Sequence, residues 1–102
     1  MSVHTGIDVL KLTGYVALQN RRVGLLTHVA ACDNNLTPTY AVLANARNVQ
    51  LKALFSPEHG LLSTAPDGAH VGHSVDAWTK LPVHSLYGNT KKHTAEMLED
   101  ID

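Results

Sequence analysis

The stretch from Val49 to Gly60, VQLKALFSPEHG, decides the fold. Residues 49–55 alternate between apolar and polar positions and then become wholly apolar, a pattern typical of a strand whose end lies in a core. The Ser56–Gly60 segment that follows is polar and contains a proline and a glycine, which favour the end of a strand. The sequence therefore predicts a strand over 49–55 with a polar turn directly at its carboxyl end.

A second buried strand is predicted upstream, over Arg22–Thr27, because the segment becomes almost continuously apolar after two arginines. Asp33-Asn34-Asn35 favours a loop, since these short polar side chains bond to the local backbone. Thr37-Pro38 is the pattern of an N-cap followed by proline at the first helical position, so a helix is expected through about Asn45. Strand, helix and strand together predict a βαβ unit with parallel strands.

The segment before this unit is predicted to form a helix. Thr5-Gly6-Ile7-Asp8 fits the acidic variant of the capping box, so the helix begins near Gly6. It ends or bends at Gly14, and a further turn is expected over Ala17–Asn20. The apolar face of this helix is expected to comprise Ile7, Val9, Leu10 and Leu12.

The residues after Gly60 predict a long loop and few regular elements. Loops of this length in compact domains tend to be functional. Residues 81–88 are predicted to hold a short strand, which Pro82 confines to a sheet edge or a strand start, and Thr94 is expected to cap a last helix through about Glu99. A further strand is expected after Ile101. We therefore expect an α/β chain, with a short, mainly parallel sheet and flanking helices, that forms part of a larger domain or is completed by another polypeptide.

Composition excludes several classes of protein. The chain has 102 residues, with 8 Lys and Arg against 9 Asp and Glu and no basic run, which argues against nucleic acid as a partner. Cys32 is the one cysteine, so no disulfide within the chain is expected. The longest apolar stretches are far shorter than the roughly 20 residues of a membrane span. Met1–His4 has no signal-peptide features, so a cytoplasmic location is expected for the sequence as it stands, with a periplasmic or secreted natural protein left open.

Glu58 is the leading candidate for chemistry. Ligands of open α/β sheets collect beyond the carboxyl ends of the strands, where Thr27-His28 and Ser56–Gly60 are both predicted to lie. The neighbouring proline and glycine would hold the Glu58 carboxyl in a defined direction, and partial burial beside Phe55 would raise its pKa, as a general acid requires. The alternative is a structural role, in which Glu58 caps the next segment or pairs with an arginine.

Other residues suggest weaker hypotheses. His70 and His73 could share a metal ion, but no third ligand lies at a typical spacing, so solvated loop histidines are the alternative. Cys32 could act as a nucleophile with a histidine, or serve as a small apolar side chain. Trp78 and Tyr87 could stack on a sugar ring or cover the sheet edge. No phosphate-binding fingerprint occurs, and we expect no metal and no other cofactor.

Five segments in order resemble the exo-β-N-acetylmuramidases of the NamZ type, a bacterial family. The resemblance implies a glycoside hydrolase that removes terminal N-acetylmuramic acid from the non-reducing end of peptidoglycan fragments. It implies a Rossmann-like catalytic domain and a C-terminal domain, with residues 1–102 as the first, incomplete portion of the former and inactive alone. The segments are Gly6–Leu10, Arg22–Thr27, Ala53–Gly60, Leu81–Gly88 and Thr94–Leu98.

The same resemblance assigns roles to individual residues. Glu58 matches the family's proposed catalytic glutamate, and Asp33 is the one candidate in this chain for a second carboxylate. A muropeptide or muramyl saccharide is the implied partner. The implied substrate-binding positions are His28, Asp33, His59, Gly60 and Tyr87.

Two departures from the family pattern bear on activity. His28 stands where the family usually has asparagine, and Leu62-Ser63 stands where it usually has an Arg-Gly pair. A lost arginine removes a bidentate partner for a sugar carboxylate, worth about 1.5 to 3 kcal/mol. The alternative function is therefore a non-catalytic sugar-binding or assembly fragment, which associates with the rest of the protein or with itself through a sheet edge. A third possibility is a metal-dependent hydrolase that uses His59, His70 and His73.

Overall fold

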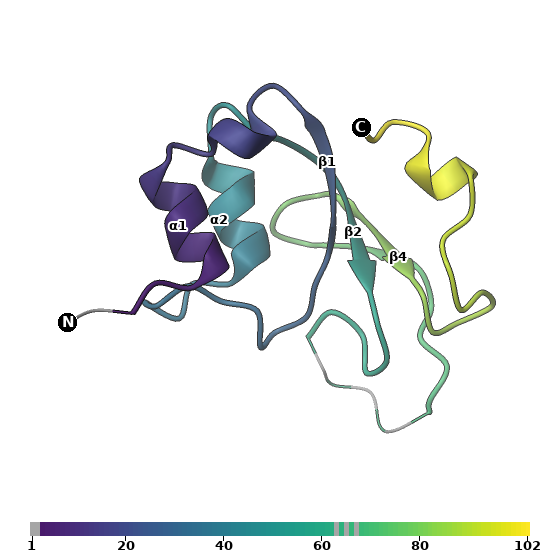
Figure 1. Cartoon of the computed structure of the whole chain (residues 1–102). Coiled ribbons are helices and arrows are strands. Elements are labelled where there is room, and N and C mark those ends of the chain that lie inside the picture. The colour runs from purple at the N-terminus through teal and green to yellow at the C-terminus, as the bar shows by residue number, and fades with distance from the viewer. Residues whose placement is uncertain (1–2, 63, 65, 67) are drawn as a thin grey trace.

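A four-stranded sheet in the order β1-β2-β4-β3 forms the middle of the molecule (Figure 1). The structure is a computed structural model that describes residues 3–62, 64, 66 and 68–102. Strands β1 (Arg22–Leu26), β2 (Gln50–Ser56) and β4 (Pro82–Ser85) run parallel, while β3 (Ser74–Val75) is antiparallel to β4. The predicted α/β class with a mainly parallel sheet is confirmed, and Pro82 begins its strand as expected.

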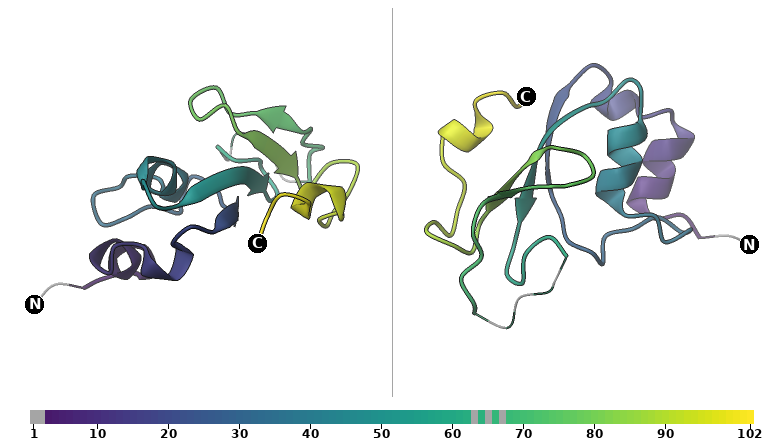
Figure 2. Two further views of the ribbon diagram at one scale, coloured as in Figure 1. Left: turned by 90° about the horizontal axis from the view of Figure 1, so that it is seen from above. Right: turned by 180° about the vertical axis from the view of Figure 1, so that it is seen from behind.

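The helices lie on both sides of this sheet. Helices α1 (Gly6–Leu12) and α2 (Thr39–Asn45) lie side by side on one face, and the terminal 3-10 turn η2 (Glu96–Leu98) lies on the other (Figures 1 and 2). A further 3-10 turn, η1 (Val16–Leu18), precedes β1. In the part of the chain that the structure describes, no helix has the length and apolar character needed to cross a membrane.

The core is centred on β2 because this strand has neighbours on both edges and layers on both faces. Leu54 lies opposite Leu25 and Val83 and is fully buried. On the face of the sheet opposite the Leu54 side chain, Gly24 leaves room for Ile101, since a Cβ at position 24 would lie 2.5 Å from Ile101 Cδ1. The buried apolar residues are Val42, Leu43, Val49, Ala53, Leu54, Phe55 and Val83.

The predicted capping box of α1 is confirmed, but its predicted apolar face is partly wrong. The Thr5 N–H donates to Asp8 Oδ2 at 3.0 Å, and the Asp8 N–H donates to Thr5 Oγ1 at 3.4 Å. Val9 and Leu12 are 49% and 70% exposed, whereas Asp8 is buried. The helix thus turns a carboxylate toward the molecule because the loop before α2 binds that carboxylate.

The extents of two helices and the presence of one strand differ from the sequence prediction. The N-cap of α2 is Pro38 and not Thr37, because the Pro38 carbonyl accepts from Ala41 and Val42 N–H. The last helix is only the single turn η2, although Thr94 Oγ1 does accept the Met97 N–H at 3.4 Å. Strand β3 was not predicted, since two exposed residues show no periodicity and depend on pairing with β4.

Candidate functional site

The carboxyl ends of the three parallel strands meet at one edge of the sheet. The Thr27 N–H donates to the Phe55 carbonyl at 3.0 Å, and the Leu86 N–H donates to the Ser56 carbonyl at 2.9 Å. The loop that follows β2 lies at the same end of the molecule (Figure 1). His28, the Glu58 turn and Tyr87 therefore follow adjacent strand ends, where α/β sheets bind their ligands.

The turn that carries Glu58 leaves β2 sharply. The Gly60 N–H donates to the Pro57 carbonyl at 3.1 Å, and Gly60 has the left-handed φ of 77° expected of a glycine at a sharp exit. His59 also has a positive φ, 73°, which a residue with a side chain adopts at a cost of about 1 to 3 kcal/mol. Such strain is concentrated at ligand sites, so this turn fits a functional role.

The Glu58 carboxylate is oriented by a backbone donor. Glu58 is half-buried, and its Oε2 accepts the Gly68 N–H at 2.6 Å. Gly68 has a φ of 71°, a conformation that glycine adopts without strain. Neither of the ion pairs formed among the described residues involves Glu58, in contrast to the structural alternative of pairing with an arginine. One glycine N–H thus fixes the direction of a carboxylate that keeps access to solvent.

A hollow of about 330 Å³ lies beside this turn. His59 and Gly60 line it from the turn, and Val83 lines it from β4. Glu58 itself is not among the residues that line this hollow, although the two residues that follow it in the turn are. Leu62, one of the two departures from the family pattern, lines the hollow and is 57% exposed, while Ser63 lies outside the described residues. At the position where the family usually has arginine, an apolar side chain therefore lines the hollow.

His28 stands at the carboxyl end of β1 in an exposed position. Its Nδ1 accepts the Ala30 N–H at 3.1 Å, and its carbonyl accepts the Ala31 N–H at 3.0 Å. These bonds turn the chain away from β1 and leave Nε2 as the ring atom that can meet a ligand. Its role in substrate binding stays a prediction.

Tyr87 is anchored through its backbone on both sides. Its N–H donates to Ser85 Oγ at 3.1 Å, and its carbonyl accepts the Val71 N–H at 3.0 Å. Gly88 allows this close approach, because a Cβ there would clash with the Val71 carbonyl oxygen. The Leu86-Tyr87-Gly88 segment thus joins the end of β4 to the long loop after Glu58.

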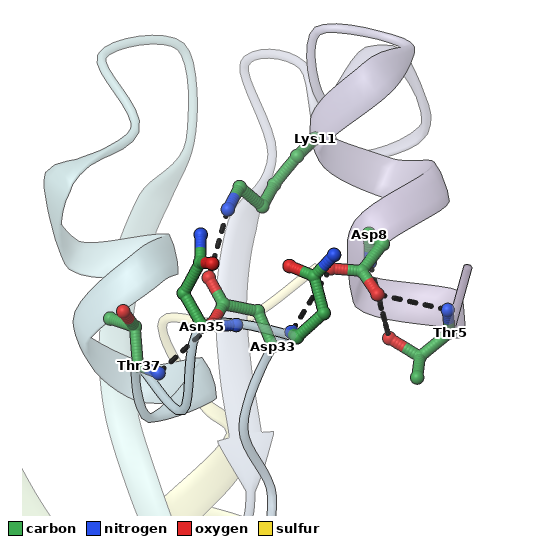
Figure 3. A network of polar contacts seen from close by, with 7 residues as sticks. Thr5, Asp8, Lys11, Asp33, Asn35 and Thr37 are labelled. Carbon is green, nitrogen blue, oxygen red and sulfur yellow. Dashed lines mark hydrogen bonds and ion pairs between the residues drawn. The ribbon is translucent and has the colours of Figure 1, made fainter. Parts of the chain in front are cut away.

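Asp33 is the centre of a polar network (Figure 3). Its Oδ2 forms an ion pair with Lys11 Nζ at 2.8 Å, and its Oδ1 accepts the Asn35 and Thr37 N–H groups, each at 2.9 Å. Asp8 of α1 accepts the Asn34 N–H at 3.3 Å. Two side chains of α1 therefore hold the loop between β1 and α2.

These contacts also shift the titration of both carboxyls. The Lys11 ammonium, followed by the Thr37 N–H, lowers the pKa of Asp33 below its ordinary value. The Thr5 backbone and hydroxyl donors lower the pKa of Asp8. Asp33 is only 4% exposed. It is therefore an ionised residue enclosed by protein donors, and a direct contact between Asp33 and substrate stays a prediction.

His70 and His73 have separate partners. His70 Nε2 lies 3.2 Å from Asn89 Oδ1, and His73 Nδ1 accepts the Ser85 N–H at 2.8 Å. No group of three or more potential His, Cys, Asp or Glu ligands comes together among the residues that the structure describes. The geometry therefore offers no support for the metal-dependent alternative.

Two features of this edge were not predicted from the sequence. Lys91 Nζ lies 3.9 Å from the ring centroid of Tyr87, a cation–π contact. The rings of His73 and His84 lie 6.0 Å apart across β3 and β4, and burial together with His73 lowers the pKa of His84. The His73–His84 contact has no sequence signal, because spacing along the chain does not reveal which strands pair. Lys91 and Tyr87 lie in the same short segment after β4, and this pair was not considered at the sequence level.

A hollow larger than the one beside the Glu58 turn lies at the other end of the sheet. Its volume is about 570 Å³, and its lining includes Gln50 at the start of β2 and Trp78. Trp78 is 58% exposed and meets Tyr40 edge to face with ring centroids 6.2 Å apart. This hollow is far along β2 from the Glu58 turn, so we do not assign the candidate chemistry to it.

The fold and the Glu58 turn place the chain among α/β proteins whose sites lie at the carboxyl edge of a parallel sheet. Residues 23–102 match the family described as "Exo-beta-N-acetylmuramidase NamZ, N-terminal", and the chain belongs to this family.

Two relatives support this membership. The chain is 42% identical over 100 residues to the peptidoglycan beta-N-acetylmuramidase NamZ of Bacillus subtilis, covering 98% of this chain and 24% of that protein. The crystal structure of a DUF1343 family protein from Bacteroides fragilis is similar with a TM-score of 0.86 and 45% identity, covering 97% of this chain and 24% of that one. The chain thus spans about a quarter of the length of the relatives it matches.

Proposed function

We propose that this chain is the N-terminal portion of a Rossmann-like catalytic domain in a glycosidase that releases terminal N-acetylmuramic acid from the non-reducing end of peptidoglycan fragments. Family membership and the name of the Bacillus subtilis relative support this proposal. The observation that carries it is the position of Glu58, on a sharp turn at the carboxyl end of the central parallel strand, with its carboxylate oriented by the Gly68 N–H.

In this mechanism Glu58 is the general acid. Its protonated carboxyl donates a proton to the departing glycosidic oxygen while the bond to the anomeric carbon breaks and an oxocarbenium-like state develops. This step leaves Glu58 ionised, and the Gly68 N–H is positioned to stabilise the negative charge of its carboxylate. A second carboxylate or a group of the substrate must then assist water or stabilise the anomeric carbon.

Asp33 is poorly placed for this second role. Its oxygens accept from Lys11 and from two backbone N–H groups, so a contact with substrate would have to displace bonds that already satisfy this buried carboxylate. We infer that Asp33 acts by holding the crossover loop in place. The second group then comes from the substrate or from a part of the protein beyond these residues.

The direct test is hydrolysis of a chromogenic N-acetylmuramide by the protein expressed from its full reading frame. Glu58→Gln keeps the size of the side chain but cannot supply the proton, so kcat should fall by about 10²- to 10⁴-fold. Unfolding measured on the same samples checks that the variant is folded. Full turnover by this variant would remove Glu58 from the mechanism.

A second candidate is a non-catalytic assembly function through the β1 edge. β1 pairs with β2 along one edge, and at the start of its other edge the Asp102 N–H donates to the Arg22 carbonyl at 2.8 Å. Leu26, at the far end of β1, is 60% exposed. Light scattering with size-exclusion chromatography tests this candidate on the chain itself: self-association is expected, and a monomer with cooperative melting speaks against it.

A further inference from the structure

Lys91 presents a positive charge at the same edge of the sheet as Glu58. Its Nζ lies 3.9 Å from the centroid of the Tyr87 ring, and Tyr87 is itself fixed by backbone bonds to Ser85 and Val71. A long, exposed lysine side chain ordinarily samples many rotamers. The ring restricts this one, so the ammonium is held near a defined place.

No ion pair neutralises this charge among the residues that the structure describes. The ion pairs among the described residues are Lys11–Asp33 and Arg22–Asp102, and Lys91 takes part in neither. Residues 86–94, LYGNTKKHT, contain two lysines and a histidine but no carboxylate. An ammonium seated on an aromatic ring without a counter-ion is suited to bind an anionic group of a ligand.

The strand pairing relates this charge to the candidate acid. Leu86, directly before Tyr87, donates its N–H to the carbonyl of Ser56, which is two residues before Glu58. The segments that carry Lys91 and Glu58 therefore leave adjacent parallel strands at the same edge. If the glycosidic oxygen of a bound sugar lies at Glu58, the other substituents of that sugar extend along this edge of the sheet.

We propose that Lys91 is a specificity-determining residue that binds the carboxylate of the substrate's muramyl lactyl group, with Tyr87 as the platform for its ammonium. This inference rests on the proposed function for the identity of the substrate. It also accounts for the apolar Leu62 near the site, because the counter-charge for the sugar comes from the β4 side. One face of the Tyr87 ring is occupied by Lys91, so a sugar does not stack on that face.

The test compares three chromogenic substrates with the full-length protein: an N-acetylmuramide, its methyl ester and an N-acetylglucosaminide. Lys91→Gln should lower kcat/KM for the charged muramide roughly tenfold, through KM, as expected for one lost charged contact. Its activity on the two uncharged substrates should match that of the unmodified protein. Lys92→Gln is the matched control, since it removes the same charge from the adjacent residue, and Lys91→Arg should restore the discrimination.

A binding measurement separates this inference from the proposed function. Calorimetry with N-acetylmuramic acid and N-acetylglucosamine, on the Glu58→Gln protein with and without Lys91→Gln, needs no turnover. Weaker binding of the acid alone supports Lys91 even if no hydrolysis is found. Equal losses for charged and uncharged sugars, unchanged binding of the acid, or no binding of the acid by the parent protein would each overturn the assignment.

Discussion

Two loops that follow neighbouring strands hold their carboxylates in opposite ways. After β1, Asp33 is 4% exposed, and its two oxygens accept from Lys11 and from two backbone N–H groups. After β2, Glu58 is half-buried, and its one carboxylate bond in the part of the chain described is from the Gly68 N–H. Both acids were candidates for chemistry on position alone.

The difference shows how to separate a structural acid from a reactive one at the same edge of a sheet. A buried carboxylate whose oxygens already accept several protein donors binds a new partner only by giving up some of those bonds. A carboxylate held by one donor keeps a direction and can still exchange a proton with a ligand. We therefore propose a structural role for Asp33 and keep Glu58 as the proposed general acid.

Exchange of Asp33 is expected to have the largest effect on stability. Asp33→Asn keeps the size of the side chain but removes the charge that pairs with Lys11 and the second acceptor oxygen, so the melting temperature should fall by several degrees. Glu58→Gln, the same chemical change in the other loop, is the control and should leave the melting temperature nearly unchanged. Differential scanning calorimetry on both variants measures this, and equal shifts would contradict the assignment.

Acid should weaken the surroundings of His84 in β4 and the Asp8–Asp33 network in separate pH windows. His84 has a lowered pKa, so as pH falls below its ordinary value of 6.5 the unfolded chain binds a proton first and stability declines. Asp33 and Asp8 also have lowered pKa values, so their stabilisation is complete above the ordinary value of 3.8 and is lost as pH falls through the folded values.

Urea unfolding at a series of pH values resolves these windows. Asp33→Asn should flatten the decline below the ordinary carboxyl pKa and leave the decline that begins near 6.5. A variant that retains the full acid decline would show that the Lys11–Asp33 pair does not contribute to it.

The smallest effect on turnover is expected at Gly68, because Gly68 orients Glu58 and takes no part in the proton transfer. Gly68→Ala meets no neighbouring atom but places a side chain at a φ of 71°, at a cost of about 1 to 2 kcal/mol. Gly72→Ala is the matched control, because Gly72 is in the same loop, has open space and lacks a positive φ. Turnover should fall only in Gly68→Ala, and equal activity in both variants would show that the left-handed conformation of Gly68, which aims its N–H at Glu58, is not needed for turnover.

Local elements were predicted well wherever neighbouring residues supply the interactions. Thr5 and Asp8 form the capping box, and the apolar runs before Thr27 and Pro57 are parallel strands. The start of α2 was misplaced by one residue, because the Thr37 N–H serves Asp33 and the Thr37 side chain does not cap the helix. The sequence pattern there was typical of a cap, but Thr37 belongs to the turn that Asp33 closes before the helix begins.

By itself the sequence determined the α/β class, the order of the main elements and the position of Glu58 at a strand end. These depend on periodicity and on backbone preferences that act over a few residues. The tertiary structure alone decided that Asp33 pairs with Lys11, that the rings of His73 and His84 meet and that a hollow forms beside the turn that carries Glu58. The physical reason is that a side chain's partner is set by the path of the whole chain, which local hydrogen bonding and periodicity do not encode.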